Sequence, residues 1–279
     1  MHVHWLQDEG CGDESVVGGK AASLSRLAAL HSVPPAFAIP GLLSHEDNLS
    51  DLLVSAICEA YSALGLRLRQ PNPAVAVRSS AIGEDGAESS FAGQHDTYLN
   101  IRGEDAVLDA VRRCARSAAS PHALAYRRQR GLPLDDILMA VLVQALVPAE
   151  IAAVVFSANP VTGSREEVMI NASWGLGESI VAGTVTPDTF IVAKAGLQLT
   201  WRDIARKTRM VVATEAGTIE LDVPADMQLA PSLTDTQLQD VASLAVRLEG
   251  HLGHAVDVEC AIAAGELFLL QCRPITTLR

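Results

Sequence analysis

The chain has 279 residues, a formal net charge of −12, 49% apolar residues and only 4% aromatic residues. This apolar content excludes a disordered chain, and the length allows one large domain or two close lobes. The negative charge and the few aromatic side chains argue against a nucleic-acid partner, because they favour neither phosphate backbones nor stacked bases.

The first half of the chain is predicted to be rich in helices. A glycine turn at Val17-Gly18-Gly19-Lys20 opens an amphipathic helix that reaches residue 31. Further along we expect a helix over 51–65, a buried strand over 74–78, a loop over 79–94, a strand over 96–101 and a helical stretch over 104–130 that breaks near Ser120-Pro121.

The second half is predicted to be rich in strands. We expect strands over 137–147, 151–157, 167–172 and 189–193. A capping box, with Thr234 as cap and Gln237 reaching back, opens a helix to about Gly250, and residues 255–273 form a hairpin. The chain is therefore expected to be α+β, with an N-terminal lobe over 1–145 and a C-terminal lobe over 146–279.

The sequence also indicates the cellular location of the protein and whether it crosses a membrane. The start of the chain lacks the basic and apolar regions of a signal peptide, and the apolar stretch 139–156 is broken by Gln144, Pro148 and Glu150. The five cysteines form no C-x-x-C pair. We expect a cytoplasmic protein without a membrane partner.

Two positions in the first half carry the residue types that bind phosphate. The glycine pair before Lys20 allows close approach to backbone amides at a helix start, and Lys20 adds a positive charge. Arg78 ends an apolar strand beside Ser79 and Ser80 and could clamp a phosphate through two hydrogen bonds. The alternatives are an ordinary glycine turn, and an ion pair of Arg78 with Glu84, Asp85 or Glu88.

The C-terminal hairpin carries a third candidate. Alternation places Gln271 and Arg273 on one face, and Asp257 and Glu259 on one face of the preceding strand. A carboxylate and an amide oxygen suit Mg²⁺ that is shared with phosphates, and Arg273 would neutralise charge during transfer. The alternative is a plain polar outer face.

Turn length offers a test of this metal site. If Glu259 faces Gln271, the turn between the strands needs an odd number of residues, such as Ala264-Gly265-Glu266. A two-residue turn would direct the two side chains to opposite faces. The metal-site hypothesis therefore predicts a three-residue turn.

Taken together, an ordered series of motifs resembles the ATP-binding domain of the phosphoenolpyruvate synthase, pyruvate phosphate dikinase and rifampicin phosphotransferase family. The resemblance runs from about residue 16 to 277 and rests on these motifs: 17–20, Ala76 to Ala81 with Glu84-Asp85, Ser90 to Asn100, Asn159 to Gly163, Gly175 to Glu178, Thr186 to Asp188 and Leu270 to Thr276. It implies an ATP-grasp-like fold with the nucleotide between two lobes.

The resemblance also implies roles for single residues. Lys20 and Arg78 would contact phosphates, and Glu259, Gln271 and Arg273 would handle metal and phosphates, with Glu259 and Gln271 as the metal ligands. Gly93, Thr97 and Gln144 match nucleotide-contact positions, and Thr97 and Gln144 are indicated by the resemblance alone. The implied catalytic residues are Lys20, Arg78 and Arg273, and the implied cofactors are ATP and Mg²⁺.

Family members pass a phosphoryl group from ATP to a histidine on a separate domain. None of the eight histidines of this chain lies in the matching context. We therefore expect an ATP-dependent phosphotransferase component whose acceptor is a histidine domain on another chain or a small molecule. The alternatives are a non-catalytic ATP-binding sensor or regulatory module and, with less support, an ATP-grasp ligase that forms acyl phosphates.

Overall fold

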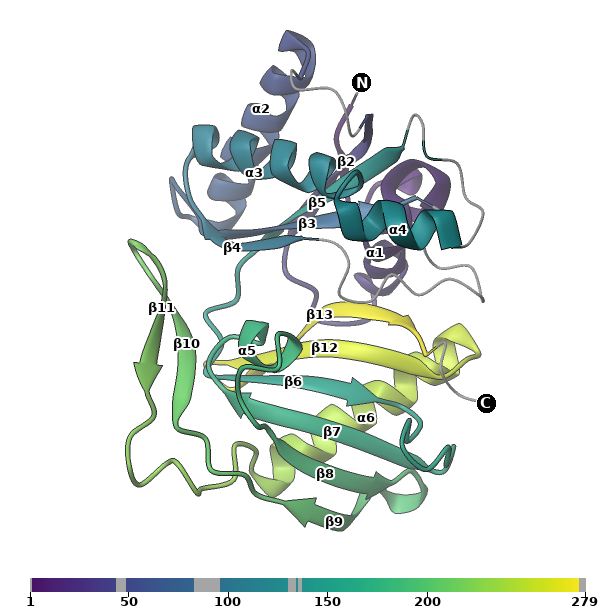
Figure 1. Ribbon diagram of the computed structural model, residues 1–279, viewed down its shortest axis with the longest axis vertical. Coiled ribbons are helices and arrows are strands. Elements are labelled where there is room, and N and C mark those ends of the chain that lie inside the picture. The colour runs from purple at the N-terminus through teal and green to yellow at the C-terminus, as the bar shows by residue number, and fades with distance from the viewer. Residues whose placement is uncertain (1, 44–48, 83–95, 130–133, 135–136, 276–279) are drawn as a thin grey trace. The chain divides into compact units, whose positions relative to one another are not determined.

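The structure is a computed structural model that describes residues 2–43, 49–82, 96–129, 134 and 137–275. The chain divides into two compact units, Met1–Leu146 and Val147–Arg279, and Figure 1 shows a sheet in each. The mixture of helices and sheets agrees with the predicted α+β, ATP-grasp-like class. No helix in the described part of the chain is long and apolar enough to cross a membrane.

The first unit is built on a five-stranded sheet with the strand order β1-β2-β5-β3-β4 and antiparallel neighbours. Its strands are β1 (His4–Trp5), β2 (Ala36–Leu43), β3 (Val75–Ala81), β4 (Thr97–Ile101) and β5 (Leu138–Ala145). Its helices are α1 (Glu14–Leu27), α2 (Asp51–Leu68), α3 (Glu104–Ser117) and α4 (Pro121–Gln129), with a 3-10 turn at Glu9–Gly12.

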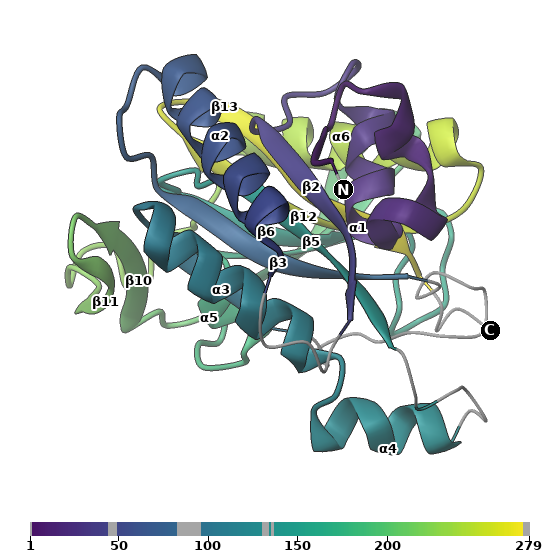
Figure 2. The ribbon, with the colours of Figure 1, turned by 90° about the horizontal axis from the view of Figure 1, so that it is seen from above.

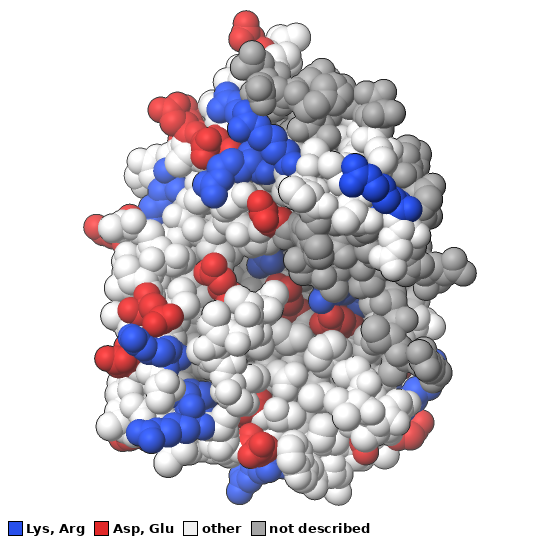
Figure 3. All heavy atoms as spheres, viewed as in Figure 1, with Lys and Arg blue, Asp and Glu red and all other residues white. Residues whose placement is uncertain are grey.

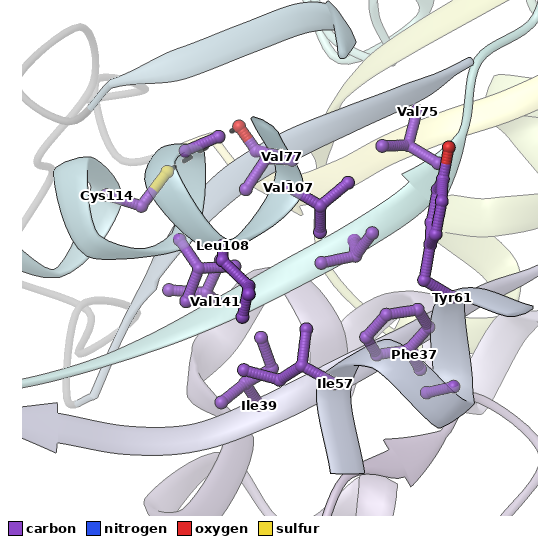
Figure 4. Packing of buried hydrophobic residues seen from close by; sticks show 14 of the residues in the cluster. Phe37, Ile39, Ile57, Tyr61, Val75, Val77, Val107, Leu108, Cys114 and Val141 are labelled. Atoms are coloured by element: carbon purple, nitrogen blue, oxygen red, sulfur yellow. Dashed lines mark hydrogen bonds between the residues drawn. The ribbon is translucent and has the colours of Figure 1, made fainter. Parts of the chain in front are cut away.

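Helices cover both faces of this sheet. Figure 2 shows α2 and α3 on one side of the strands and α1 on the other. The core between the sheet and α2 and α3 is mostly aliphatic and includes two aromatic side chains. Ile57 and Tyr61 come from α2, Val107 from α3 and Phe37 from β2 (Figure 4). Because this face holds the odd-numbered residues of β3, the even-numbered Arg78 and Ser80 lie on the face of α1.

The second unit is built on a six-stranded antiparallel sheet with the order β13-β12-β6-β7-β8-β9. The strands are β6 (Ile151–Phe156), β7 (Glu167–Trp174), β8 (Asp188–Ala193), β9 (Gln198–Asp203), β12 (Val256–Ala263) and β13 (Glu266–Pro274). Helix α6 (Asp235–Leu252) packs on β12, β6 and β7, and α5 (Glu178–Val181) is a single short turn. A separate hairpin joins β10 (Arg209–Thr214) to β11 (Gly217–Asp222).

One buried carboxylate ties both ends of the segment that carries this hairpin to the sheet. Asp188 accepts from Lys207 Nζ at 2.5 Å and from the Ala205 amide at 3.0 Å before the hairpin. After the hairpin it accepts from the amide and hydroxyl of Ser232 at 2.7 and 2.8 Å. All the hydrogen-bonding capacity of this fully buried carboxylate is thereby used within the fold.

Most predicted elements of both units are confirmed. The helical break near Ser120-Pro121 separates α3 from α4, and Thr234 forms the capping box with Gln237. Helix α1 differs from its prediction, because it begins at Glu14 and is kinked at Gly18 rather than opened by the glycine pair. Strands β1, β2, β9, β10 and β11 were not predicted.

Candidate functional site

The glycine pair lies against the end of β3. Gly18 has a φ of +73°, and a Cβ atom there would lie 2.1 Å from the Ser80 carbonyl oxygen, so only glycine fits. Beyond the kink, the Ala21 amide donates to Ser80 Oγ at 3.2 Å and Lys20 Nζ donates to the Ser79 carbonyl at 3.0 Å. The fold therefore places the Lys20 ammonium beside the residue that follows Arg78. The prediction that Arg78 ends its strand is wrong, because β3 continues through Ser79 and Ser80 to Ala81.

Arg78, Thr97 and Gln144 share one face of the first sheet. Arg78 lies directly opposite Thr97 on β4, and Gln144 on β5 is opposite Ala76, two residues from Arg78. Side chains in such positions are direct or diagonal neighbours. Gln144 and Arg78 are buried, whereas Thr97 is exposed. Three predicted site residues of the first unit thus share one face beside the first half of β3, and Lys20 reaches the same strand at Ser79.

Ser79 lies on the opposite face of the sheet and holds the start of β4 through two hydrogen bonds. Its amide and hydroxyl both donate to the Asp96 carbonyl, at 3.2 and 3.0 Å, on the side of the sheet covered by α3. Cys114 of α3 donates to the same carbonyl at 3.8 Å, and burial raises the pKa of its thiol to about 12, which keeps the donor protonated. Ser79 therefore fixes the residue before Thr97 while its own carbonyl holds Lys20.

Tyr98 strengthens the start of β4. Its hydroxyl donates to Asp96 Oδ2 at 2.6 Å, and the Arg113 guanidinium lies 3.9 Å from the centre of its ring.

Gly93, the remaining predicted contact of this unit, lies outside the described residues, as do the acidic residues considered as ion-pair partners of Arg78.

In the second unit, Glu259 of β12 lies directly opposite Gln271 of β13, as the metal-site hypothesis requires. The predicted three-residue turn is wrong, because Ala263 pairs with Glu266 across a two-residue turn, Ala264-Gly265. Both turn residues have positive φ, 50° and 78°.

A β-bulge reconciles the even turn with the facing side chains. The register shifts between Glu259 and Cys260, so that Leu270 is the extra residue in β13. Past the bulge, Asp257 lies opposite Arg273 on the same face as Glu259 and Gln271. Turn length alone could not predict this register, because the bulge adds the odd residue inside the strand.

Asp257, which was not among the predicted ligands, forms an ion pair with Arg273. Arg273 donates to Asp257 Oδ2 from Nε at 2.9 Å and from Nη2 at 2.7 Å. Burial raises the pKa of the Asp257 carboxyl above its ordinary value, and Glu259 adds to the rise, although Arg273 opposes it. Its place two residues before Glu259 was the signal that could have identified Asp257.

The donor set of this hairpin suits a hard cation that is shared with a ligand. Within the part of the chain that the structure describes, no group of three or more His, Cys, Asp or Glu side chains could hold a metal alone. Glu259 and Gln271 offer one carboxylate and one amide oxygen, and Mg²⁺ commonly takes one or two protein carboxylates with substrate phosphates and water. The residues present therefore fit a magnesium ion that arrives with a polyphosphate.

Comparison with family models matches residues 41–279 to the AMP/ATP-binding domain of pyruvate phosphate dikinase. A probable phosphoenolpyruvate synthase of Methanocaldococcus jannaschii is 38% identical over 99% of this chain and 27% of its own length. The phosphoenolpyruvate synthase of Pyrococcus furiosus is 41% identical over 87% of this chain and 31% of its own length. The prodigiosin synthesizing transferase PigC of Serratia marcescens is 38% identical over 94% of this chain and 32% of its own length.

The chain thus spans about a quarter to a third of the length of these relatives. Among solved structures, the D-alanyl-alanine synthetase A of Vibrio cholerae aligns with a TM-score of 0.40 at 12% identity, over 93% of this chain and 55% of that chain. A Pyrococcus horikoshii protein aligns with a TM-score of 0.45 at 13% identity, over 94% of this chain and 91% of that chain. Scores this low carry no inference about this chain.

Proposed function

The chain belongs to the family of the pyruvate phosphate dikinase AMP/ATP-binding domain, and from this premise we propose that it binds Mg-ATP and transfers a phosphoryl group from it. The acceptor is a histidine domain on another chain or a small molecule. The observation that carries the proposal is the facing pair Glu259 and Gln271 beside Arg273, on one face of one hairpin. The predicted cytoplasmic location stays a prediction, as does the position of the nucleotide between the two lobes.

Each proposed residue has a role that its chemistry supports. Lys20 and Arg78 donate hydrogen bonds to phosphate oxygens and balance their negative charge. Thr97 and Gln144, with Gly93, contact the nucleotide. Glu259 and Gln271 hold Mg²⁺, which supplies charge neutralisation on the phosphates when bound.

Arg273 stabilises the charge that develops on the transferred group, and Asp257 fixes the orientation of its guanidinium. An arginine held by two hydrogen bonds to one carboxylate oxygen loses little further freedom when it meets a phosphate. Transfer then needs only an acceptor nucleophile in line with the bond that breaks.

The test is titration calorimetry of the full chain with ATP, with and without Mg²⁺. We expect micromolar binding that requires Mg²⁺ and weakens about tenfold or more in Arg273→Ala, the size of a lost charged hydrogen bond. Arg273→Lys, which keeps a charge beside Asp257, guards against misfolding. Arg202→Ala, which removes an exposed arginine from β9, serves as the control.

Nucleotide products then separate the possible reactions. AMP with phosphate indicates dikinase-type transfer, and ADP indicates simple kinase transfer. Binding without turnover under every partner tested would favour the sensor module instead. Absence of ATP binding by the wild-type chain would overturn the proposal.

A further inference from the structure

A row of polar side chains continues from the Glu259–Gln271 pair across the second sheet. Glu259 on β12 lies opposite Val154 on β6, Val154 opposite Asn171 on β7, and Asn171 opposite Thr189 on β8. Direct partners in antiparallel strands project from the same face. Asn171 and Thr189 therefore share the face that carries the proposed metal ligands.

This face is the one that α6 leaves uncovered. The neighbouring residues Val155, Ile170 and Phe190 alternate to the opposite face and are almost completely buried there. Figure 1 shows α6 behind the sheet, and in the same view few charged side chains lie over β6, β7 and β8 (Figure 3). Asn171 and Thr189 are only partly buried, so both reach this face.

Thr189 orients the amide of Asn171. Thr189 Oγ1 donates to Asn171 Oδ1 at 2.9 Å, which holds the amide oxygen toward β8. The two N–H donors of the amide are then directed away from β8, on the side of β6 and β12.

The spacing between the strands fits one small anionic group. Neighbouring strands lie about 4.8 Å apart, so β7 and β12 are separated by about 10 Å with β6 between them. Only Val154, a short and partly buried side chain, stands between Asn171 and Glu259 in this row. A phosphoryl group between them would reach Glu259 through a shared Mg²⁺, because the bare carboxylate would repel it, and would accept directly from the Asn171 amide.

We propose that Asn171 is a further phosphate-binding residue, which donates its amide N–H to an oxygen of the terminal phosphoryl group of the nucleotide, and that Thr189 positions this amide. The inference rests on the proposed function, because it takes Glu259 and Gln271 as the place where the polyphosphate is held. It adds a neutral donor to the cationic phosphate-binding residues Lys20, Arg78 and Arg273.

The experiment compares the affinities of the full chain for ATP and for adenosine. Asn171→Asp replaces the donor by a carboxylate of the same shape. We expect it to weaken ATP binding about tenfold or more while the affinity for adenosine stays within about twofold of wild type. Thr189→Val, which keeps the shape but removes the orienting hydroxyl, is expected to weaken ATP binding about threefold.

Gln198→Glu makes the same amide-to-carboxylate change on the exposed edge strand β9, and it should leave both affinities within about twofold of wild type. Thermal unfolding checks that each variant is folded, and Asn171→Ser replaces Asn171→Asp if the latter is not. If Asn171→Asp loses affinity equally for ATP and adenosine, or loses no affinity for ATP, the proposed role of Asn171 is overturned. Failure of the wild-type chain to bind ATP refutes the proposed function itself, so the two failures are distinguishable.

Discussion

Ser79 shows how a residue that faces away from a ligand can still fix the residues that face it. Its hydroxyl lies on the α3 side of the sheet and donates to the Asp96 carbonyl, while its own carbonyl accepts from Lys20. Arg78 and Thr97, on the other face, are its neighbours in the chain and across the strand pair. The position of Thr97 therefore depends on the Ser79 hydroxyl, and that of Lys20 on the Ser79 carbonyl, although the Ser79 side chain lies on the other face.

We expect Ser79→Ala to weaken ATP binding about fivefold, because the Asp96–Thr97 segment loses the hydroxyl hydrogen bond that ties its backbone to β3. Ser117→Ala is the matched control, since Ser117 is also buried and its hydroxyl donates to the Cys114 carbonyl at 2.7 Å. Both variants should lose about 1 kcal/mol of unfolding free energy. Titration calorimetry and urea denaturation measure the two effects, and equal affinities in the two variants would contradict the positioning role.

The raised pKa of Asp257 predicts a pH dependence of stability. The folded state holds the proton of this carboxyl to a higher pH than the unfolded state, whose pKa is near 3.8. Stability from this group is therefore fully present below that pH and is lost as the pH rises through the folded pKa. The Asp257→Asn variant has no carboxyl to titrate at this position, so its unfolding free energy lacks this decrease. The unfolding free energy of wild type, measured by urea denaturation, should therefore fall relative to that of the variant from pH 4 to 7.

At the scale of elements, the packing of α1 on β3 depends on the absence of one side chain. We expect Gly18→Ala to lower the unfolding free energy by about 3 kcal/mol or more, because it combines a positive φ with a clash against the Ser80 backbone. Gly12→Ala is the control, since no atom lies within 4 Å of a Cβ placed there. Denaturation should show a change of no more than about 0.5 kcal/mol for that variant.

The elements that were missed share a physical cause. Every residue of β9 is exposed and five of six in β11 are, so neither strand shows the alternation by which a half-buried strand is recognised. Strand β2 contains Pro40 and Gly41, residues that indicate a turn, and its ladder with β5 shifts register between Ile39 and Leu42. Elements with a regular apolar face, such as β3, β5 and α6, were predicted because they bury that face.

The candidate site was predictable only in part for a related reason. Lys20, Arg78, Glu259, Gln271 and Arg273 stand out as polar residues at glycine turns or strand positions, where their type has a chemical meaning. The role of Ser79 depends on a hydrogen bond between segments that are distant in the chain, which no local pattern reveals, whereas the place of Asp257 two residues before Glu259 was a signal that could have identified it. Thr97 and Gln144 were indicated only by family resemblance, and the registers of β4 and β5 place them on the face of Arg78.

At the scale of the whole molecule, the proposal draws ligands from both compact units. We expect Arg78→Ala in the first unit and Gln271→Ala in the second each to abolish most of the rise in unfolding temperature that Mg-ATP causes, because a ligand stabilises only the state that binds it. Thermal unfolding with and without nucleotide measures this. A variant in one unit that leaves the full rise would remove that residue from the nucleotide site.

The bulge at Leu270 divides the C-terminal hairpin into two parts whose registers differ by one residue. The turn at Ala264-Gly265 sets the register of the strand segments beside it. The bulge then shifts the register by one residue before Glu259 and Gln271. Because the register at Glu259 and Gln271 is the sum of turn and bulge, an insertion of one residue at the exposed tip would send the two side chains to opposite faces. A fluorophore attached by exchange of a tip residue keeps the number of residues, so it could report on ligand binding without shifting the side chains that bind the ligand.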